Sequence, residues 1–534
     1  MRIGGMASGM DTEQMVKDLM RAERMRVDRF TQDRQRIEWR QEAFHDVNRT
    51  MANFVLNTRK TFTGQERTIN QSHINRFDWV KTANSSREDI VSATGTAQAM
   101  SGTHTIEVKE MATVARASSV KLKGENEDGI IGADNKFKQD GKITIENGDG
   151  ESVKIEIKQG ETSINDFIKE INDANIGMRA AYDRNLDQMM ITTVNTGKNQ
   201  AIKFSSADFD LSEMFGEEHD IIDGGVKGTD AKVKFNDTVV ENSTNNMSFY
   251  GINLVLNSAA VGTEVTINVD TDVDGIYGKV EEFVNSYNEM LDEINGLTSQ
   301  KFYRDFPPLT DEQKQAMSEN DIELWEEKAR SGLLRNDETL NRVTSSIRNG
   351  LYENVAVDSG SFNHLSQIGI TTGAYQEGGK LVINEDRLRD AIHNDPEGIV
   401  NLLFQTSDKE IPKEGDAEEI RNATQQKRSE TGLVHRMYED MVSGMKEVIR
   451  RSGHGGDSNL YRTIQSNMLV DFVTSGSQSV LDRDVANINR RISREEDLLV
   501  RREERYWRQF SAMEKALHEM HSQSDWLMAQ MYQQ

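Results

Sequence analysis

The stretch VANINRRISREEDLLVRREERYWRQFSAMEKALHEMHSQSDWL, residues 485–527, decides the fold because its apolar residues recur at every seventh position. The repeat consists of Val485, Ile492, Leu499, Tyr506, Met513, Met520 and Leu527. A sustained period of seven is typical of a long helix with a coiled-coil-like seam. A lone helix cannot bury such a seam, so this stretch predicts a helix that needs a partner.

The beginning of the chain predicts that partner. Asp11 is a plausible N-cap, with Gln14 three residues later as the reciprocal member of a capping box. No glycine or proline interrupts the chain from there to Gly64, and a second seven-residue seam follows, made of Phe30, Ile37, Phe44 and Met51. We therefore expect residues 1–45 to form an N-terminal helix that pairs with a C-terminal helix at 490–534. Both seams are candidate oligomer contacts.

The first residues, GGMASGMDTEQMVKDLM, carry methionines at five-residue intervals. Five residues rotate a helix by about 500°, so successive methionines lie about 140° apart around it and occupy several of its sides. A helix that is apolar on several sides is one that neighbours surround, and methionine adapts to varied neighbours. The sequence therefore predicts a docking segment made of Met10, Met15, Leu19 and Met20. A loosely packed end within one domain is the alternative.

The middle of the chain is different, with short alternating runs such as HTIEVKEM and GKITIENGDGESVKIEI that predict antiparallel strands. Asn147-Gly148 and Asp149-Gly150 predict a hairpin turn between Ile145 and Val153, and Ser163 with Asp166 predicts a capped helix. The sequence thus indicates an α+β multidomain protein, in which long terminal helices and a helical bundle bracket a β-rich head. The expected parts are a bundle of 46–82 with 279–348 and 430–489, a head of 83–278 with 350–405 that is two small domains, and a polar linker at 406–429.

Composition excludes several classes of function. The 534 residues include 64 Lys plus Arg against 89 Asp plus Glu, a formal net charge of −25, which argues against nucleic acid or an anionic membrane as the main partner. There is no cysteine, so thiolate catalysis and Cys-ligated zinc are excluded. No apolar run is long enough for a membrane span. The first residues lack the pattern of a cleavable secretory signal, and an export route that reads no such signal would leave the same trace.

One motif has the spacing of a calcium loop. In DTDVDGIYGKVE, Asp270, Asp272 and Asp274 precede Gly275, and Glu281 stands at the twelfth position. The run before it, EVTINV, reads as a strand, whereas an EF-hand requires a helix there. The favoured alternative is that Asp274 caps a helix beginning near Ile276, with the other aspartates on an acidic turn.

No other pattern predicts a chemical site. His518 with His521, and His435 with Glu439, lie one helical turn apart, but neither pair has further metal ligands at a recognisable spacing. Solvent-facing polar positions explain both pairs better. Phosphate-binding glycine loops and a nucleophile elbow are missing from the sequence. We therefore expect no enzyme activity, no cofactor and no metal.

The chain resembles a known family in several segments that occur in the same order. In SGMDTEQMVKDLMRAE, Ser8, Gly9, Asp11 and Thr12 match the opening of flagellar hook-associated protein 2, the filament cap protein, with Met10 where leucine is usual. The remaining similar segments are FDWVKT, REDIVSATGTAQAMSGTHTIEVKEMATVARA, ETSINDFIKEINDANIGMRAAYD, FVNSYNEMLDEI, SGLLRNDETL, IGITTGAYQEGGKLVINEDRLRDAI and FSAMEKALHEMHSQSDWL.

The resemblance implies a structural cap at the distal tip of the bacterial flagellar filament, which promotes ordered flagellin assembly and prevents loss of exported subunits. It implies a homo-oligomeric ring, expected to be a pentamer, with flagellin and the hook–filament junction proteins as partners. It also implies that the paired terminal helices are legs directed towards the filament, that their two seams are oligomer or filament contacts, and that the β-rich domains form a plate. Unfolded export through the flagellar type III apparatus, an export chaperone at residues 481–534 and a secreted location follow from the same likeness. Adhesin-like binding of host or surface ligands by the head is the alternative function.

Overall fold

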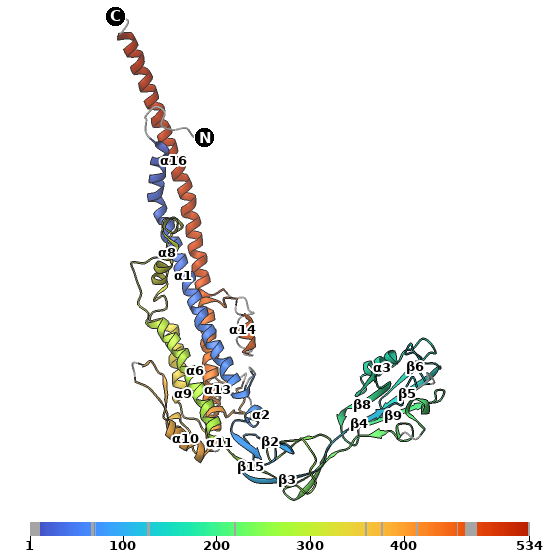
Figure 1. Ribbon diagram of the computed structural model, residues 1–534. Coiled ribbons are helices and arrows are strands. Elements are labelled where there is room, and N and C mark those ends of the chain that lie inside the picture. Colours follow the sequence, from blue (N-terminus) through green and yellow to red (C-terminus); the bar gives the residue numbers. More distant parts are fainter. Residues whose placement is uncertain are drawn as a thin grey trace. The chain divides into compact units, whose positions relative to one another are not determined.

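The computed structural model describes residues 11–65, 69, 71–124, 129–217, 220–357, 360–374, 377–412, 415–456, 458–464 and 478–531. The chain divides into two compact units (Figure 1). A helical unit contains residues 1–71 and 277–534, and a β-rich unit contains residues 72–276. Long terminal helices thus bracket β-rich sheets, which confirms the predicted α+β fold class.

Two helices of 52 residues each dominate the helical unit, α1 (Thr12–Thr63) and α16 (Val480–Met531). The carboxylate of Asp11 accepts a hydrogen bond from the backbone N–H of Gln14 at 2.9 Å, which confirms the predicted N-cap. The Gln14 side chain bonds Asp18 instead of the cap backbone, so the reciprocal half of the capping box is not formed. Gly64 ends α1 in the left-handed conformation, where a residue without Cβ is unstrained.

The C-terminal half of α1 belongs to a helical bundle with α6 (Val273–Ser299), α9 (Glu338–Tyr352), α11 (Pro396–Phe404) and α13 (Leu433–Ser452). Aromatic rings fill its centre: Phe62 meets Phe404 edge-on at 4.5 Å between centroids, and Phe54 lies 6.1 Å from Phe283. Each fully buried ring of this size contributes about 1.5–3 kcal/mol. This packing fixes the C-terminal half of α1 in the bundle.

A buried arginine ties three helices of the bundle together. The guanidinium of Arg436 on α13 is fully buried and donates to the backbone oxygens of Glu353 and Asn354, each at 3.0 Å, and of Ser429 at 2.7 Å. Glu353 ends α9, and Ser429 lies in the last turn of α12 (Ala417–Glu430). A cation is favourable at helix C-termini because their free carbonyls carry partial negative charge.

The shorter helices complete the described chain. In the helical unit these are α7 (Asp311–Gln315), α8 (Glu319–Arg330), η1 (Leu365–Ile368), α10 (Glu385–Asn394) and α14 (Ser458–Thr463), with a small sheet of β16 (Ile370–Thr372) and β17 (Leu381–Ile383). In the β-rich unit they are α3 (Ile164–Asp173), α4 (Ser212–Phe215) and α5 (Asp220–Asp223); α2 (Gln71–Ile74) lies at the boundary of the two units.

The β-rich unit has two hydrophobic clusters, each covered by its own sheets. One cluster lies under a five-stranded sheet of order β1-β15-β3-β11-β12 and a three-stranded sheet β13-β14-β2. Its strands are β1 (Lys81–Ser85), β2 (Val91–Gly95), β3 (Gly102–Glu110), β11 (Ala231–Phe235), β12 (Thr238–Asn242), β13 (Asn246–Phe249), β14 (Ile252–Leu256) and β15 (Val265–Thr271). Every pairing among them is antiparallel.

The other cluster lies between α3 and the sheets β10-β9-β5-β6 and β4-β8-β7. These strands are β4 (Val114–Ser118), β5 (Gly141–Asn147), β6 (Ser152–Ile157), β7 (Met178–Asp183), β8 (Gln188–Thr196), β9 (Ala201–Ser206) and β10 (Val226–Lys227). Ile145 pairs with Val153 across the predicted hairpin, and Ser163 with Asp166 forms a complete capping box at the start of α3. Both local predictions are confirmed.

Two predicted boundaries need correction. The predicted β-rich head includes residues 350–405, but these belong to the helical unit, because β16 and β17 pair only with each other and Leu381 exchanges two 2.8 Å hydrogen bonds with the Asn288 side chain of α6. The predicted linker at 406–429 contains α12, which buries no residue. Its helix formers, acidic first turn and basic last turn favour a helix without an apolar stripe.

Candidate assembly surface

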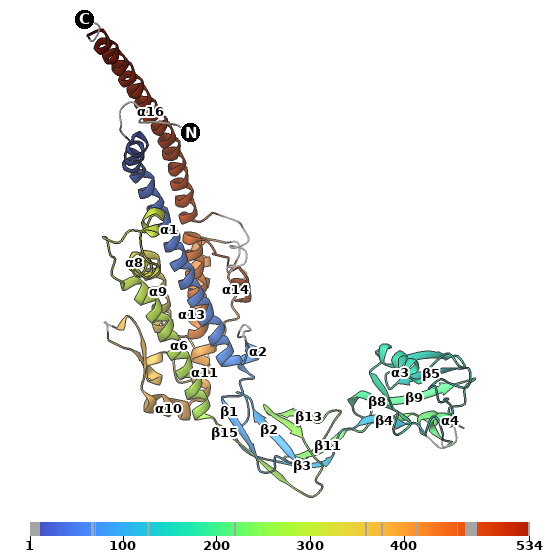
Figure 2. The ribbon, with the colours of Figure 1, turned by 45° about the horizontal axis from the view of Figure 1, so that its top comes forward.

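The terminal helices form an antiparallel pair whose register is fixed by polar contacts. The hydroxyl of Tyr506 donates to Glu23 at 3.2 Å, and Arg502 forms an ion pair with the same carboxylate. Further down, the Gln41 amide donates to Asp482 at 2.8 Å. The start of α1 therefore lies beside the turns of α16 that contain Met513, and both views show the two helices side by side (Figures 1 and 2).

The structure distributes the predicted seam over three environments. Phe44 and Met51 are fully buried inside the bundle, and Ile492 and Leu499 are buried at 8% and 9% exposure. The half-buried members are Phe30, Ile37, Val485, Tyr506 and Met513. Met520 and Leu527 are 58% and 55% exposed. Phe44 and Met51 therefore have no surface left for a partner molecule. This corrects the expectation that the whole seam is intermolecular. A period of seven shows that a helix packs against something, but it does not show whether the partner is in the same chain or in another one.

The end of α16 runs past the described start of α1 (Figure 2). Residues 514–531 extend for ~27 Å at 1.5 Å per residue. Along this length Met520, Trp526, Leu527 and Met528 are each more than half exposed. A helix end with this much exposed apolar surface is typical of a segment that packs against another molecule.

The predicted docking segment is exposed only in part. Met10 lies outside the described residues. Met15 and Leu19 are each 39% exposed, and Met20 is half-buried. The buried residue of this turn is Val16, at 2%, which faces α16 from the same side of α1 as Glu23. The start of α1 thus presents one apolar side to α16 and leaves the others free.

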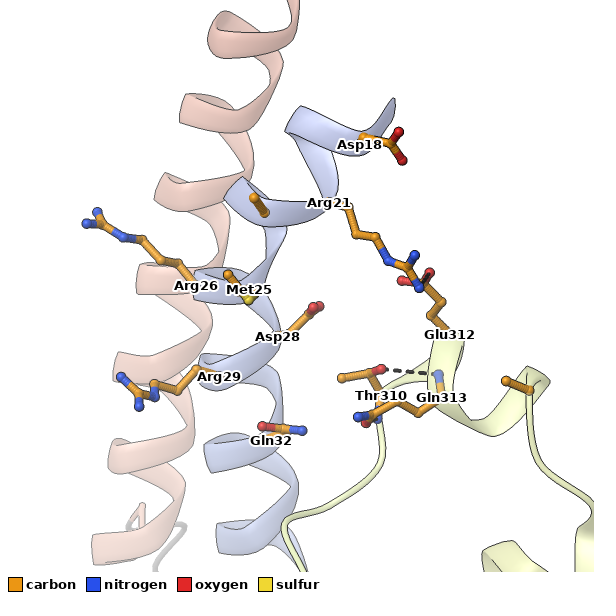
Figure 3. A pocket seen from close by; sticks show the side chains of 12 residues that line it. Asp18, Arg21, Met25, Arg26, Asp28, Arg29, Gln32, Thr310, Glu312 and Gln313 are labelled. Atoms are coloured by element: carbon orange, nitrogen blue, oxygen red, sulfur yellow. Dashed lines mark hydrogen bonds and ion pairs between the residues drawn. The ribbon is translucent and has the colours of Figure 1, made fainter. Parts of the chain in front are cut away.

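A groove lies along the side of α1 that faces away from α16. It has a volume of about 1070 Å³ and is bounded by α1 residues 18–32 and by the turn leading into α7 (Figure 3). The guanidinium of Arg21 forms an ion pair with the carboxylate of Glu312 across the groove, at 2.9 Å. Met25, which also lines the groove, is 66% exposed. Thr310 and Gln313 form a reciprocal capping box at the start of α7.

Sequence reasoning missed two positions that hold α1 in place. Trp39 is 4% exposed, and the guanidinium of Arg330 stacks on its ring at 4.5 Å while pairing with Glu42 at 2.9 Å. Asp337 is buried, caps α9 and accepts from Arg40 at 2.7 Å. Both contacts join segments about 300 residues apart. The only local signal is the N-cap position of Asp337 in RNDETL.

The aspartates of the calcium-like motif lie at a helix start. The carboxylate of Asp272 accepts from the backbone N–H of Gly275 at 2.8 Å, and α6 begins at Val273. The expectation that Asp274 is the cap is therefore wrong by two residues. Asp270 accepts from Asn268 and Glu281 from Tyr277. In the described parts of the chain, three or more metal-ligating side chains do not converge anywhere.

The histidine pairs differ from each other. His518 and His521 are exposed, as expected. His435 is not a solvent-facing residue: its ring meets Tyr438 edge-on at 6.3 Å, and burial lowers its pKa to about 4, against a backbone hydrogen bond to Phe404 that raises it. The sequence prediction failed here because histidine on α13 faces the bundle, which helix spacing alone does not reveal.

The lowered pKa of His435 predicts that acid reduces the stability of the helical bundle. Since its folded pKa lies below the ~6.5 of an unfolded histidine, its stabilising effect is complete above that pH and is lost as the pH falls towards 4. We expect His435→Leu to flatten the pH dependence of unfolding by about 3 kcal/mol between pH 6.5 and 4 in urea titrations. His518→Leu is the exposed control and should keep the wild-type profile. Identical profiles for His435→Leu and wild type would contradict this assignment.

Among the described helices, none combines the length and apolarity required to cross a membrane.

Comparisons with known proteins connect this chain to a family. The model for the N-terminus of flagellar hook-associated protein 2 matches residues 8–115, and the model for its C-terminus matches residues 228–522. The flagellar hook-associated protein 2 of Halalkalibacterium halodurans is 32% identical to the chain over 98% of both sequences. That of Thermotoga maritima is 23% identical over 72% of this chain and 54% of its own length. A crystal structure of the flagellar cap protein FliD from Escherichia coli aligns with 76% of this chain and 95% of its own at a TM-score of 0.49 and 20% identity.

Proposed function

The chain belongs to the flagellar hook-associated protein 2 family, and from this premise we propose that it is the structural cap at the distal tip of the bacterial flagellar filament. There it promotes the ordered assembly of flagellin and prevents the loss of exported subunits. The observation that carries the proposal is the 32% identity with a hook-associated protein over 98% of both chains. The family is a structural one and not an enzyme family.

The terminal helices give the proposal a mechanism. The β-rich unit contributes to a plate at the filament tip, and the α1–α16 pair is a leg that contacts the filament. The exposed end of α16, with Met520 and Leu527, docks against flagellin together with Met15, Leu19 and Met20 of α1. Met10 extends the same docking segment in the sequence. Methionine suits a contact whose partner changes as the filament grows, because its flexible side chain fits differently shaped neighbours.

The proposal includes an assembly route. The subunits pass unfolded through the flagellar type III export apparatus and are thereby secreted. They then form a homo-oligomeric ring, a pentamer. Flagellin and the hook–filament junction proteins are its partners. A cysteine-free chain suits unfolded export because it cannot be trapped by disulfides. An export chaperone binds the C-terminal helix, whose apolar residues need cover before assembly.

Deletion of the protein tests the proposal. We expect cells without it to stop swimming and to release monomeric flagellin into the medium, because exported subunits then leave the tip before they fold into place. Expression of the wild-type chain should restore both properties. Deletion cells that swim normally and leave no monomeric flagellin in the medium would refute the cap assignment.

A further inference from the structure

The β-rich unit consists of two lobes with separate hydrophobic cores. The inserted lobe contains residues 114–227, with β4 to β10 and α3 to α5, and the chain enters it from β3 and leaves it towards β11. The base lobe contains the remaining strands, β1 to β3 and β11 to β15. Each lobe has its own hydrophobic cluster, and the two clusters share no residue. The burial of these clusters therefore stabilises each lobe by itself and does not fix one lobe against the other.

Two stretches of chain connect the lobes, residues 111–113 and 228–230, and together they form a neck (Figure 2). The backbone N–H of Thr113 donates to the backbone oxygen of Thr229 at 3.0 Å, and the two hydroxyls lie 2.8 Å apart. This pairing is an isolated bridge and not part of a sheet. A connection of two single stretches bends more easily than a lobe with a packed core, so the neck has the form of a hinge.

One turn of the inserted lobe reaches past the neck to the base lobe. It joins β8 to β9, and the hydroxyl of Thr196 donates to the backbone oxygen of Ser243, which follows β12, at 2.6 Å. The ammonium of Lys198 forms an ion pair with Asp230 in the neck at 3.1 Å and another with Glu241 of β12 at 3.4 Å. We call these five residues the latch.

Asp230 and Gly197 show that the latch is a specific contact. The side chain of Asp230 is 14% exposed, and its carboxylate also accepts from the backbone N–H of Lys198 at 2.8 Å. The hydrogen bonds from the backbone and the side chain of Lys198 lower the pKa of this carboxyl. Gly197 has a φ of +117°, and a Cβ there would lie 2.9 Å from the Cβ of Ser243. A residue without a side chain thus stands where the two lobes meet.

The latch is nevertheless easy to open. The side chains of Lys198 and Glu241 are 62% and 49% exposed, and exposed ion pairs contribute little and are screened by salt. Glu241 also pairs with Lys232 of its own lobe at 3.3 Å. Its carboxylate therefore keeps a partner when Lys198 leaves, which lowers the cost of opening.

We propose that these five residues form a salt-sensitive latch between the lobes, and that the neck is the hinge about which the inserted lobe swings when Lys198 releases Asp230 and Glu241. In the closed state the latch fixes the inserted lobe against the base lobe. In the open state the neck alone holds it. Ionic strength shifts the balance between the two states, because it weakens only the closed one. The inference concerns the β-rich unit and does not depend on the proposed cap function.

Distances between spin labels test the latch in the full chain, and labelling is site-specific because the natural sequence contains no cysteine. Met190→Cys on β8 and Val255→Cys on β14 place one exposed label in each lobe. We expect one narrow distance distribution at low salt and a second, broader population at high salt, as the ion pairs are screened. This titration leaves every latch residue in place. A distribution that is the same at low and high salt would overturn the proposal.

Lys198→Met should open the latch without added salt. It removes both ion pairs, and we expect the ratio of open to closed molecules at low salt to rise about tenfold. Lys142→Met is the matched control, because Lys142 pairs with Glu156 at 3.6 Å within the inserted lobe and is 66% exposed. It should leave the distribution unchanged. A ratio for Lys198→Met no higher than that for Lys142→Met would refute the latch.

Gly197→Ala provides a second measurement that leaves all charges in place. The added Cβ collides with Ser243, so we expect the open population at low salt and a loss of its salt dependence. A closed distribution like that of the wild type would contradict the proposal. None of these outcomes decides the cap function, which fails only if deletion cells swim and retain their flagellin.

Discussion

Leu499→Asp is expected to open the α1–α16 pair and to abolish cap function while the β-rich unit stays folded. Leu499 is 9% exposed on the side of α16 that faces α1. Replacing it with a carboxylate removes a buried apolar side chain and places an uncompensated charge beside α1. Together these changes destabilise the pairing by about 3–5 kcal/mol. Hydrogen exchange of residues 12–40 should accelerate, and motility should be lost in cells that carry only this variant.

The adjacent residue provides the control. Val500 is 58% exposed, so Val500→Asp adds the same charge one position away without entering the pair. It should leave exchange of α1 unchanged. Circular dichroism gives the opposing outcome: if the strand signal collapses together with the helical one in Leu499→Asp, the leg and the β-rich unit are not separable, and the prediction fails.

Arg436→Met is expected to destabilise the helical bundle by about 3–5 kcal/mol, because it leaves buried carbonyls without a donor. The guanidinium is fully buried and bonds three backbone oxygens at the ends of α9 and α12. Methionine fills much of the space but donates nothing, and each buried carbonyl left without a partner costs about 1–3 kcal/mol. The unfolding midpoint in urea, followed by the helical signal in circular dichroism, should shift accordingly.

Arg421→Met is the matched control for this prediction, because Arg421 is exposed on α12. It should leave the free energy of unfolding within about 0.5 kcal/mol of wild type. A similarly small change for Arg436→Met would mean that water replaces the guanidinium at these helix ends.

Features that depend on residues close together in the sequence could be predicted, whereas those that depend on distant segments could not. The cap at Asp11, the turn that pairs Ile145 with Val153 and the capping box of Ser163 depend on neighbours within a few residues, and all three are confirmed. The environment of His435 depends on α11 and α13 meeting across the bundle. Nothing near it in the sequence carries that information.

The candidate surface shows the same division. Periodicity identified residues that pack, but the period is the same for seam positions in opposite environments. Phe44 packs beneath the guanidinium of Arg451 from α13, which lies 5.7 Å from the centre of its ring, whereas Met520 remains 58% exposed. The groove beside α1 was missed for another reason. Its residues are mostly polar, and a search for apolar seams passes over them.

The antiparallel register has a mechanical consequence. Since the first turns of α1 lie beside the part of α16 that contains Met513, a load applied there pulls the two helices apart from their open end. Such peeling breaks contacts one turn at a time, whereas sliding the helices would break all of them at once. Towards the other end, α13 and the stacked Trp39 and Arg330 stiffen the structure. The helix pair is therefore expected to separate more easily at its open end than at the end that the bundle holds.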